Sequence, residues 1–399
     1  MHETCDVTIV GGGVIGCAIA DRLCTEGLQV IIVEAGDKLG DGASSSAMGG
    51  IISETDDSCF TPLGEITRHS RRLYPAWLRE IEERSGVPVP LLRTGAIQVA
   101  LDAEEMRRLE TRVFPRWAAT GSDVRRLGRD ELLKREPLLS PQVRGGYLLP
   151  SEPALEPVTL MSSLSSALRL HREARVKTGS RAVAVRPDAG GAVVVLDNGV
   201  TLRSAAAVIA GGHLSGALIP RLARFLFPVK GEAMEVRPPD HRHAYPLRHH
   251  VYSIVDLGGS RCPAYAVPRI SGRLSAGVSY DVGVSVPRPT LANQAMIRRG
   301  LAALIPAAAR WPAIRHCAGI RPATADDLPL VGPADADGRV VLATGHHGLG
   351  ITLAPATAEM VSAVLGTTPM TPRLRRHLAV CGPGRFMRGG ASGAATGLD

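Results

Sequence analysis

The hydrophobic pattern is clearest near the start of the chain. Residues 7–10 form a short apolar run that ends in glycines, which is typical of a buried parallel strand. Ala20 and Leu23, followed by Gly27, predict a helix with a glycine at its C-terminal end. A second apolar run over 30–33 predicts another strand. This part of the chain therefore predicts a β–α–β unit.

Further along, several stretches carry apolar residues at helical spacing among charged ones, and these stretches predict helices. Asp102 is expected to cap one of them, and Pro355 to open the last. The helices are expected over 61–86, 102–119, 153–170, 291–304 and 355–365.

Short apolar or alternating runs between these helices predict strands. The turn Asp197-Asn198-Gly199 favours a hairpin between two of them. Another predicted strand stops at Gly211, where the backbone is expected to reach a ligand. The strands are expected over 96–101, 181–186, 192–196, 201–204, 205–210, 227–236, 265–268, 273–280 and 340–343.

The turn after the first strand has the G-x-G-x-x-G spacing, with glycines at Gly11, Gly13 and Gly16. The first glycine allows a sharp turn, the second allows a pyrophosphate to approach the backbone, and the third allows the helix to pack on the strand. Glu34 ends the second strand, where an acidic residue accepts the hydroxyls of an adenosine ribose and would repel a 2′-phosphate. The pattern predicts a dinucleotide site, in which the helix presents the N–H groups of its first residues, Val14 and Ile15.

Two more stretches of small residues extend this prediction. The run 40–50 is either a flexible linker or a segment that crosses the pyrophosphate and a flat ring closely, through Ala43, Ser44, Ser45, Met48 and Gly49. A later Gly-rich turn precedes a second helix and is expected to face the ring through His346, Gly348, Leu349, Gly350, Ile351 and Thr352. Two such sites in one chain favour FAD over NAD.

Composition narrows the class of protein. Hydrophobic residues make up 45% and charged residues 21% of 399, which describes a globular protein. The net charge is +8, but no nucleic-acid-binding motif accompanies it, so no nucleic-acid partner is expected. No stretch approaches the ~20 apolar residues of a membrane span. The seven cysteines lack disulfide or metal spacing, which indicates thiols in a reducing cytoplasm.

Several separated motifs, in the same order, resemble the D-amino-acid oxidase superfamily, and within it most of all the glycine oxidases of thiamine biosynthesis. Besides the glycine fingerprint with Glu34, they are the small-residue run 42–50, Phe227-Pro228-Val229-Lys230-Gly231-Glu232, Tyr265-Ala266-Val267-Pro268-Arg269, Gly319-Ile320-Arg321-Pro322 and the stretch 345–355.

The resemblance implies that Arg321 pairs with a substrate carboxylate and that Tyr265 hydrogen-bonds the same group. It also implies that Gly348 and Ile351 lie near the flavin and that Val183 contacts the adenine side. Gly211 and Gly319 are expected near the cofactor as well. The planar fork of a guanidinium suits a carboxylate, although a surface arginine and a core tyrosine are the alternative interpretations. Tyr252 and Tyr280 compete with Tyr265 for its role.

The fold class that follows is α/β plus α+β. A discontinuous FAD-binding Rossmann-like domain of the glutathione-reductase type is expected over 1–45, 153–218 and 320–366. A substrate domain with an antiparallel sheet is expected over 46–152 and 219–319, and a C-terminal tail over 367–399, with its end from Gly382 disordered. The connection 237–264 contains His241, His243, His249 and His250, which lack zinc-site spacing, so no metal is expected; its length indicates a remodelled pocket cover.

The predicted activity is FAD-dependent oxidative deamination of a small amino acid, glycine first, with sarcosine or D-amino acids as further substrates and molecular oxygen as acceptor. The flavin performs the difficult step, so no catalytic side chain is expected. FAD is expected to be non-covalent, because the spacing around Cys317 does not match that of covalent flavoenzymes. A dehydrogenase of the same fold with another acceptor and a flavin-binding protein without turnover are the alternatives. The sequence leaves open whether the chain forms a homo-oligomer.

Overall fold

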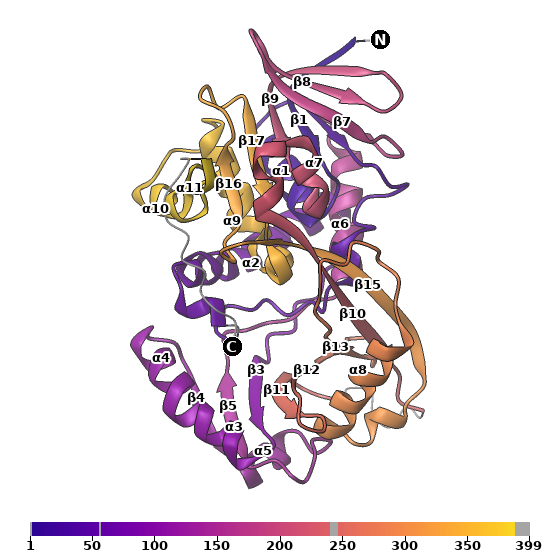
Figure 1. The fold of residues 1–399 in the computed structure, drawn as a ribbon, viewed down its shortest axis with the longest axis vertical. Helices are drawn as coiled ribbons and strands as arrows, with labels where there is room; N and C mark the ends of the chain where they lie inside the picture. The colour runs from indigo at the N-terminus through magenta and orange to yellow at the C-terminus, as the bar shows by residue number, and fades with distance from the viewer. Residues whose placement is uncertain (1, 56, 240–245, 388–399) are drawn as a thin grey trace.

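The computed structural model describes residues 2–55, 57–239 and 246–387. Figure 1 shows two parts, one above the other, each built around a sheet. Strands β10 (Leu226–Val236) and β15 (Ala313–Thr324) pair along their lengths and run from the upper part into the lower one. Both strands belong to the lower sheet, and through them the chain passes between the two parts.

The upper sheet has eight strands, in the order β16-β17-β9-β1-β2-β6, with the β7–β8 hairpin attached through β8 to β9. Five adjacent strands of this sheet, β6, β2, β1, β9 and β17, are parallel, which is typical of a sheet covered on both faces. The strands are β1 (His2–Val10), β2 (Val30–Val33), β6 (Ala174–Lys177), β7 (Ala182–Asp188), β8 (Gly191–Leu196), β9 (Thr201–Ile209), β16 (Leu330–Pro333) and β17 (Val340–Thr344).

The lower sheet has nine strands and is mostly antiparallel, in the order β14-β10-β13-β12-β11-β3-β5-β4, with β15 on the other side of β10. Only the β3–β11 pair is parallel among the pairs that the structure describes. The remaining strands are β3 (Ala96–Ala100), β4 (Arg125–Gly128), β5 (Gly145–Leu149), β11 (His250–Asp256), β12 (Arg261–Pro268), β13 (Leu274–Gly277) and β14 (Asp281–Val282).

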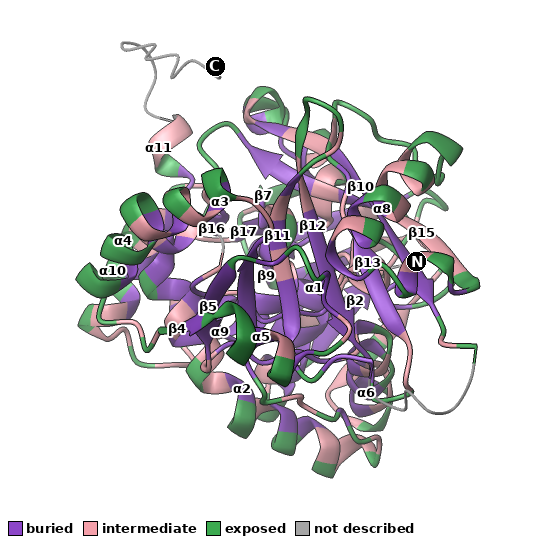
Figure 2. Cartoon of the chain, turned by 90° about the horizontal axis from the view of Figure 1, so that it is seen from below, coloured by how far each residue is buried: buried purple, intermediate pink, exposed green. Residues whose placement is uncertain are grey.

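The long helices cover the sheets, and Figure 2 shows exposed residues on the outer faces of some of them. The helices α1 (Val14–Thr25), α2 (Leu63–Ser85), α6 (Pro157–Leu170) and α9 (Gly350–Val364) share one apolar core with the upper sheet. Helix α8 (Leu291–Leu304) packs on the lower sheet. The shorter helices are α3 (Ala103–Arg108), α4 (Phe114–Ala119), α5 (Arg129–Arg135), α7 (Ser215–Leu218), α10 (Pro372–Cys381) and α11 (Gly384–Met387). Within the described ranges, no helix combines the length and apolar character that crossing a membrane requires.

The predicted fold class is confirmed, and so are most of the predicted elements. Asp102 caps α3 as expected, with its carboxylate accepting from the N–H of Glu105 at 2.7 Å. Two of the predicted strands, 201–204 and 205–210, are wrong as separate elements. They form the single strand β9, because β1 pairs with β9 along almost its whole length.

Three other expectations need correction. The predicted strand 273–280 is shorter, since β13 ends at Gly277. The connection 237–264 is not only a pocket cover, because it contains β11, an interior strand of the lower sheet; His241 and His243 lie outside the described residues. The predicted disorder from Gly382 is wrong for its first part, which forms α11, and the remainder lies outside the described residues.

The start of α9 also differs from the prediction. The helix begins at Gly350 and runs through Pro355, which was expected to open it. Proline has no N–H to donate to the carbonyl four residues earlier, that of Ile351. The hydroxyl of Tyr74, on α2, donates to this carbonyl instead. The helix therefore tolerates an interior proline because another helix satisfies the freed acceptor.

Candidate active site

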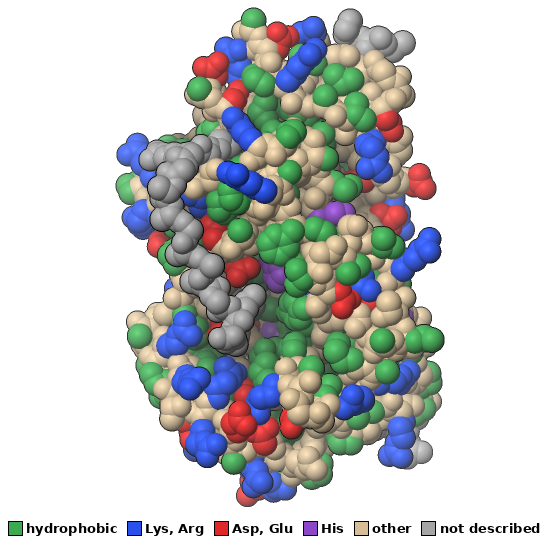
Figure 3. All heavy atoms as spheres, in the orientation of Figure 1, with side chains coloured by type: hydrophobic (Ala, Val, Ile, Leu, Met, Phe, Trp, Pro, Cys, Tyr) green, Lys and Arg blue, Asp and Glu red, His purple; other side chains and the backbone are tan. Residues whose placement is uncertain are grey.

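A cavity of about 1400 Å³ is lined by residues from both sheets. In Figure 3, hydrophobic side chains gather at the middle of one face, and histidine side chains show between them. The first turns of α1 and α9, which pack in the same core, both line the cavity. Two long helices thus direct the positive ends of their dipoles toward one space.

The turn between β1 and α1 forms one end of the cavity. Gly11 and Gly13 line it, and the N–H of Val14 donates to the Ser44 hydroxyl at 2.9 Å. Gly16 lies beneath the turn, where a Cβ would stand 1.9 Å from the Gly11 carbonyl oxygen. Only glycine allows this packing of helix on strand, which agrees with the role expected for the third glycine of the motif.

Glu34 lies at the same end of the cavity. Its carboxylate accepts from the N–H groups of Gly12 and Gly36, each at 2.7 Å. These bonds fix the side chain beside the glycine turn. A carboxylate has about four acceptor positions, so two remain for the hydroxyls of a ribose.

The residues present fit FAD. The cavity is bordered by backbone at two glycine-rich turns, one before α1 and one before α9, and it contains an acidic side chain fixed beside the first turn. An elongated dinucleotide with a flat ring system requires this combination of close backbone approach and helix N-termini.

Most of the residues predicted to bind the cofactor line the cavity; the exceptions are Gly16, Ser45 and Thr352. Gly16 packs against Gly11, as described above. The Ser45 hydroxyl donates to the Gly40 carbonyl at 2.6 Å, and the Thr352 hydroxyl accepts from the N–H of Ile52 at 3.0 Å. The predicted residues that do line the cavity are Gly11, Gly13, Val14, Ile15, Glu34, Ala43, Ser44, Met48, Gly49, Val183, Gly211, Gly319, Arg321, His346, Gly348, Leu349, Gly350 and Ile351.

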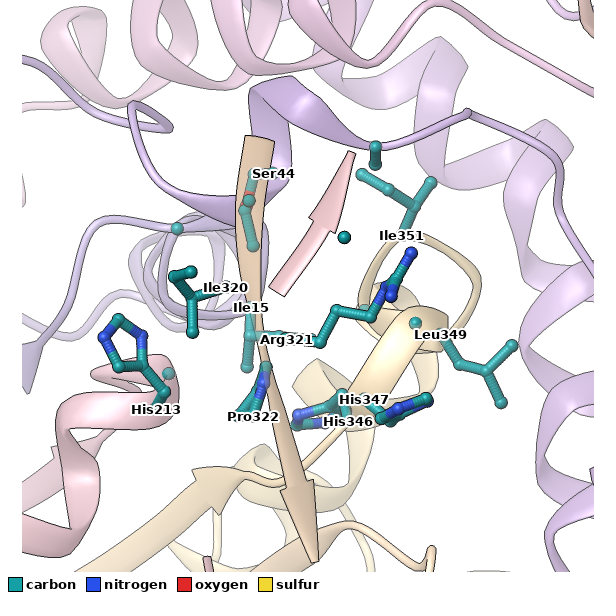
Figure 4. A pocket seen from close by; sticks show the side chains of 18 of the residues that line it. Ile15, Ser44, His213, Ile320, Arg321, Pro322, His346, His347, Leu349 and Ile351 are labelled. Carbon is teal, nitrogen blue, oxygen red and sulfur yellow. The ribbon is translucent and has the colours of Figure 1, made fainter. Parts of the chain in front are cut away.

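Arg321 extends from β15 toward Leu349 and Ile351 at the start of α9 (Figure 4). Its Nη1 donates to the Ser279 carbonyl at 2.9 Å, and its Cζ lies 4.5 Å from the centre of the Tyr280 ring. Burial lowers the pKa of its guanidinium, and no carboxylate among the described residues forms a salt bridge with it. A half-buried cation without a salt bridge to a described carboxylate is suited to an anionic ligand.

Tyr265 lies in a row of cavity-lining residues that crosses the lower sheet at one register. Tyr252 on β11 stands opposite both Gln98 on β3 and Tyr265 on β12, and Tyr265 stands opposite Gly277 on β13. The rings of Tyr252 and Tyr265 meet edge to face, with centroids 6.2 Å apart. Gln98, Tyr252 and Tyr265 form one wall of the cavity, which we call the lower wall.

Sequence reasoning missed Gln98, whose Oε1 is buried and has no hydrogen-bond partner among the described residues. A polar residue inside the apolar run 96–100 was the only available signal. Gly231 and Glu232 belong to one of the motifs that resemble the family but are not among the predicted site residues, and both line the cavity. Tyr252 and Tyr280, the alternatives to Tyr265, also line it, so all three tyrosines surround one space.

His346 also lines the cavity, in the turn before α9, and its side chain contacts that helix. Its Nε2 lies 3.0 Å from the Thr357 hydroxyl on α9, and burial lowers the pKa of its imidazole to about 3. A neutral, buried imidazole with a partner on α9 orders the turn before the helix. In the part of the chain that the structure describes, no cluster of three or more His, Cys, Asp or Glu side chains could hold a metal ion.

Comparisons with known proteins agree with this geometry. A family model described as FAD dependent oxidoreductase, the DAO family, matches residues 6–364. The glycine oxidase of Geobacillus kaustophilus (strain HTA426) is 31% identical over 365 residues, which cover 91% of this chain and 93% of that protein. The crystal structure of glycine oxidase from Geobacillus kaustophilus has a TM-score of 0.83 and covers 91% of this chain and 95% of that one.

A more distant structure, L-proline dehydrogenase from P. horikoshii, has a TM-score of 0.80 at 20% identity and covers 97% of this chain and 99% of that one. At this identity the likeness concerns the fold. The match over residues 6–364, the fold and the cavity with its two glycine-rich turns lead to one conclusion: this chain belongs to the DAO family of FAD-dependent oxidoreductases.

Proposed function

We propose that this protein is an amino-acid oxidase that converts glycine, water and oxygen into glyoxylate, ammonia and hydrogen peroxide. The observation that carries the proposal is Arg321, a cavity-lining cation without a salt bridge to any described carboxylate, beside the turn before α9. The similarity to glycine oxidases at 31% identity supports glycine as the first substrate.

Bound FAD supplies the acceptor for the hydride that leaves the substrate Cα. The chain supplies the cradle: Gly11, Gly13 and Val14 for the pyrophosphate, Glu34 for the ribose, and the first turn of α9 for the ring. Arg321 holds the substrate carboxylate so that Cα is oriented, and the apolar walls exclude water. The imine product then hydrolyses to the oxoacid and ammonia.

Several finer assignments belong to the same proposal. FAD is non-covalent, which agrees with the position of Cys317: this residue is not among those that line the cavity, and its thiol lies 3.5 Å from the Ala233 carbonyl. The domains keep the boundaries given above, with the qualification that α2 shares the core of the upper sheet. The proposed setting is the cytoplasm, which the cysteine pattern indicates, and the proposed pathway is thiamine biosynthesis, which the resemblance implies.

The test is an anaerobic titration of the purified flavoprotein with a panel of amines: glycine, sarcosine, proline, D-alanine and iminodiacetate. Glycine is expected to bleach the flavin most efficiently, and admission of oxygen to restore the colour with one peroxide per turnover. Bleaching followed by reoxidation only with dye or quinone acceptors would replace the oxidase by a dehydrogenase. If no amine reduces the flavin, the proposed function is wrong.

A further inference from the structure

Tyr265 is held by a buried chain of hydrogen bonds. Its hydroxyl lies 2.7 Å from Nδ1 of His250, and Nε2 of the same imidazole lies 3.0 Å from the backbone carbonyl of Glu152. Tyr265 is 7% exposed, His250 1% and Glu152 0%. His250 is on β11 and Tyr265 on the adjacent strand β12, so the sheet fixes the distance between them.

Glu152, whose backbone carbonyl accepts the last of these hydrogen bonds, is itself held firmly in place. The carboxylate of Glu152 accepts from the N–H groups of Ser53 at 2.5 Å and Thr55 at 3.0 Å, and also from that of Glu54. These bonds anchor Glu152 to the segment that follows the small-residue run. The acceptor for His250 therefore has little freedom to turn away.

The chemistry of the partners sets the direction of each bond. A carbonyl oxygen only accepts, so Nε2 of His250 carries the hydrogen. Burial lowers the pKa of His250 to about 4, so the imidazole is neutral near pH 7 and its Nδ1 has a free lone pair. Burial also raises the pKa of Tyr265, so its hydroxyl keeps its proton and donates it to Nδ1.

A phenol has one proton, and here that proton points at His250. What remains on the Tyr265 oxygen is acceptor capacity. The oxygen lies against Gly50, where a Cβ would stand 2.0 Å from it, and both residues line the cavity. A ligand group that reaches this oxygen must be a donor.

We propose that His250 is a positioning residue that makes Tyr265 a hydrogen-bond acceptor, so that Tyr265 binds the substrate amine while Arg321 alone binds the carboxylate. The inference rests on the proposed amino-acid substrate. It replaces the expectation that Tyr265 binds the carboxylate, because a carboxylate only accepts. For Tyr265 to donate to it, Nδ1 of His250 would lose its partner inside the protein, which costs free energy.

The direct test of the hydrogen bond is the tautomer of His250. Nitrogen NMR of the ¹⁵N-histidine-labelled holoenzyme, assigned by comparison with His250→Gln, is expected to show one imidazole with a bare Nδ1 and a protonated Nε2 from pH 8 down to pH 6. A protonated Nδ1 would overturn the proposal, whatever the substrate proves to be. This measurement stands even if the amine panel shows no turnover.

The test of ligand contacts compares glycine with acetate, which has the carboxylate but no amine. In Tyr265→Phe, the KM for glycine is expected to rise about 2- to 10-fold, the effect of one neutral hydrogen bond, while the Kd for acetate from flavin absorbance stays within twofold. In His250→Leu, the freed hydroxyl is expected to tighten acetate binding while glycine binding weakens. Equal weakening of both ligands by Tyr265→Phe would overturn the proposal.

The matched control is His249→Gln. His249 precedes His250 on the chain, pairs through Nδ1 with Glu136 at 2.6 Å and is not among the residues that line the cavity. Its replacement is expected to change neither the KM for glycine nor the Kd for acetate. FAD content and Tm verify that each variant is folded, and the Tyr265→Phe and NMR measurements decide the question if His250→Leu does not fold.

Discussion

Gly231 on β10 lies directly against the guanidinium of Arg321: a Cβ on Gly231 would stand 2.2 Å from Cζ and 2.5 Å from Nη1. A Cβ is essentially never found within 3.0 Å of a non-bonded heavy atom of another residue, so any side chain at this position must displace the guanidinium. Because the guanidinium is the far end of a flexible side chain, the fold can accommodate this shift. The proposed binding of a carboxylate cannot, because it depends on the position of the guanidinium.

Gly231→Ala is therefore expected to lower kcat/KM for glycine by about 10- to 100-fold, with FAD content and Tm nearly unchanged, since a displacement near 1 Å has an effect of this order. Steady-state kinetics and a thermal melt check both parts. Gly128→Ala is the control, because a Cβ at this strand glycine meets nothing within 4 Å. Normal kinetics in Gly231→Ala would mean that Arg321 does not position the substrate.

Substitutions of Arg321 itself are expected to distinguish the contribution of its charge from that of the planar guanidinium. Arg321→Lys keeps the charge but loses the planar fork, and one charge-assisted hydrogen bond contributes ~1.5–3 kcal/mol, so kcat/KM for glycine should fall by about one to two orders of magnitude. Arg321→Met removes the charge as well, so kcat/KM for glycine should fall further in this variant. Glycine esters and amides, which lack the carboxylate, should distinguish little between the wild type and Arg321→Met, and wild-type rates in both variants would remove Arg321 from the site.

Replacement of Glu34 is expected to weaken FAD binding without affecting Arg321. Glu34→Arg removes the acceptor for the N–H groups of Gly12 and Gly36 and places a cation in a partly buried site. Glu34→Gln retains one acceptor oxygen and should have a smaller effect. The ratio of flavin to protein after dialysis measures the loss; unchanged occupancy in Glu34→Arg would exclude a role for this residue in binding FAD.

The mode of FAD attachment can be checked by precipitation. Acid-denatured protein is expected to release its yellow colour into the supernatant, because Cys317 is not among the residues that line the cavity and burial raises the pKa of its thiol. Colour that stays with the pellet would show a covalent bond, and peptide mapping would then locate it.

His346 is expected to make the protein more sensitive to acid. Its pKa is about 3 in the folded protein and about 6.5 in an unfolded chain, so between these values the unfolded state binds a proton that the folded state does not. Stability is therefore lost as the pH falls below about 6.5, by about 2 kcal/mol at pH 5. His346→Asn should reduce the drop in Tm between pH 7.5 and pH 5 by about 2 °C; an equal drop in both proteins contradicts the assignment.

The sequence was sufficient to predict both structure and site where the residues of a site lie within one local pattern. The β1–α1–β2 unit follows from an apolar run, three glycines and an acid, all within one supersecondary unit. The start of α9 could not be predicted in this way. Pro355 leaves the backbone carbonyl of Ile351 without its usual N–H partner, and the hydroxyl that replaces that partner belongs to Tyr74, on another helix. Local proline rules describe isolated helices and do not include such partners.

The lower wall shows the same limit for the site. The segment 96–101 was predicted as a strand, yet Gln98 belongs to the cavity only because β3, β11 and β12 align Gln98, Tyr252 and Tyr265 at one register. Likewise, the direction of the Tyr265 hydroxyl depends on His250, a residue that the sequence placed in a connection. Pairing between strands, and not the pattern within each strand, decides these contacts.

The upper sheet also has a consequence for biosynthesis. Its first strand, β1, pairs with β9, as in the pair His2 and Thr201, and β9 pairs in turn with β17, as in Ala207 and Val340. A ribosome that has made only β1, α1 and β2 has produced the glycine-rich turn after β1 but not β9, the strand that pairs with β1. Such distant pairings slow folding and leave strand edges exposed during synthesis. The sheet is therefore complete only once β17 has been made, and the cavity only once the first turn of α9 has, so FAD is expected to bind after nearly the whole chain has been synthesised.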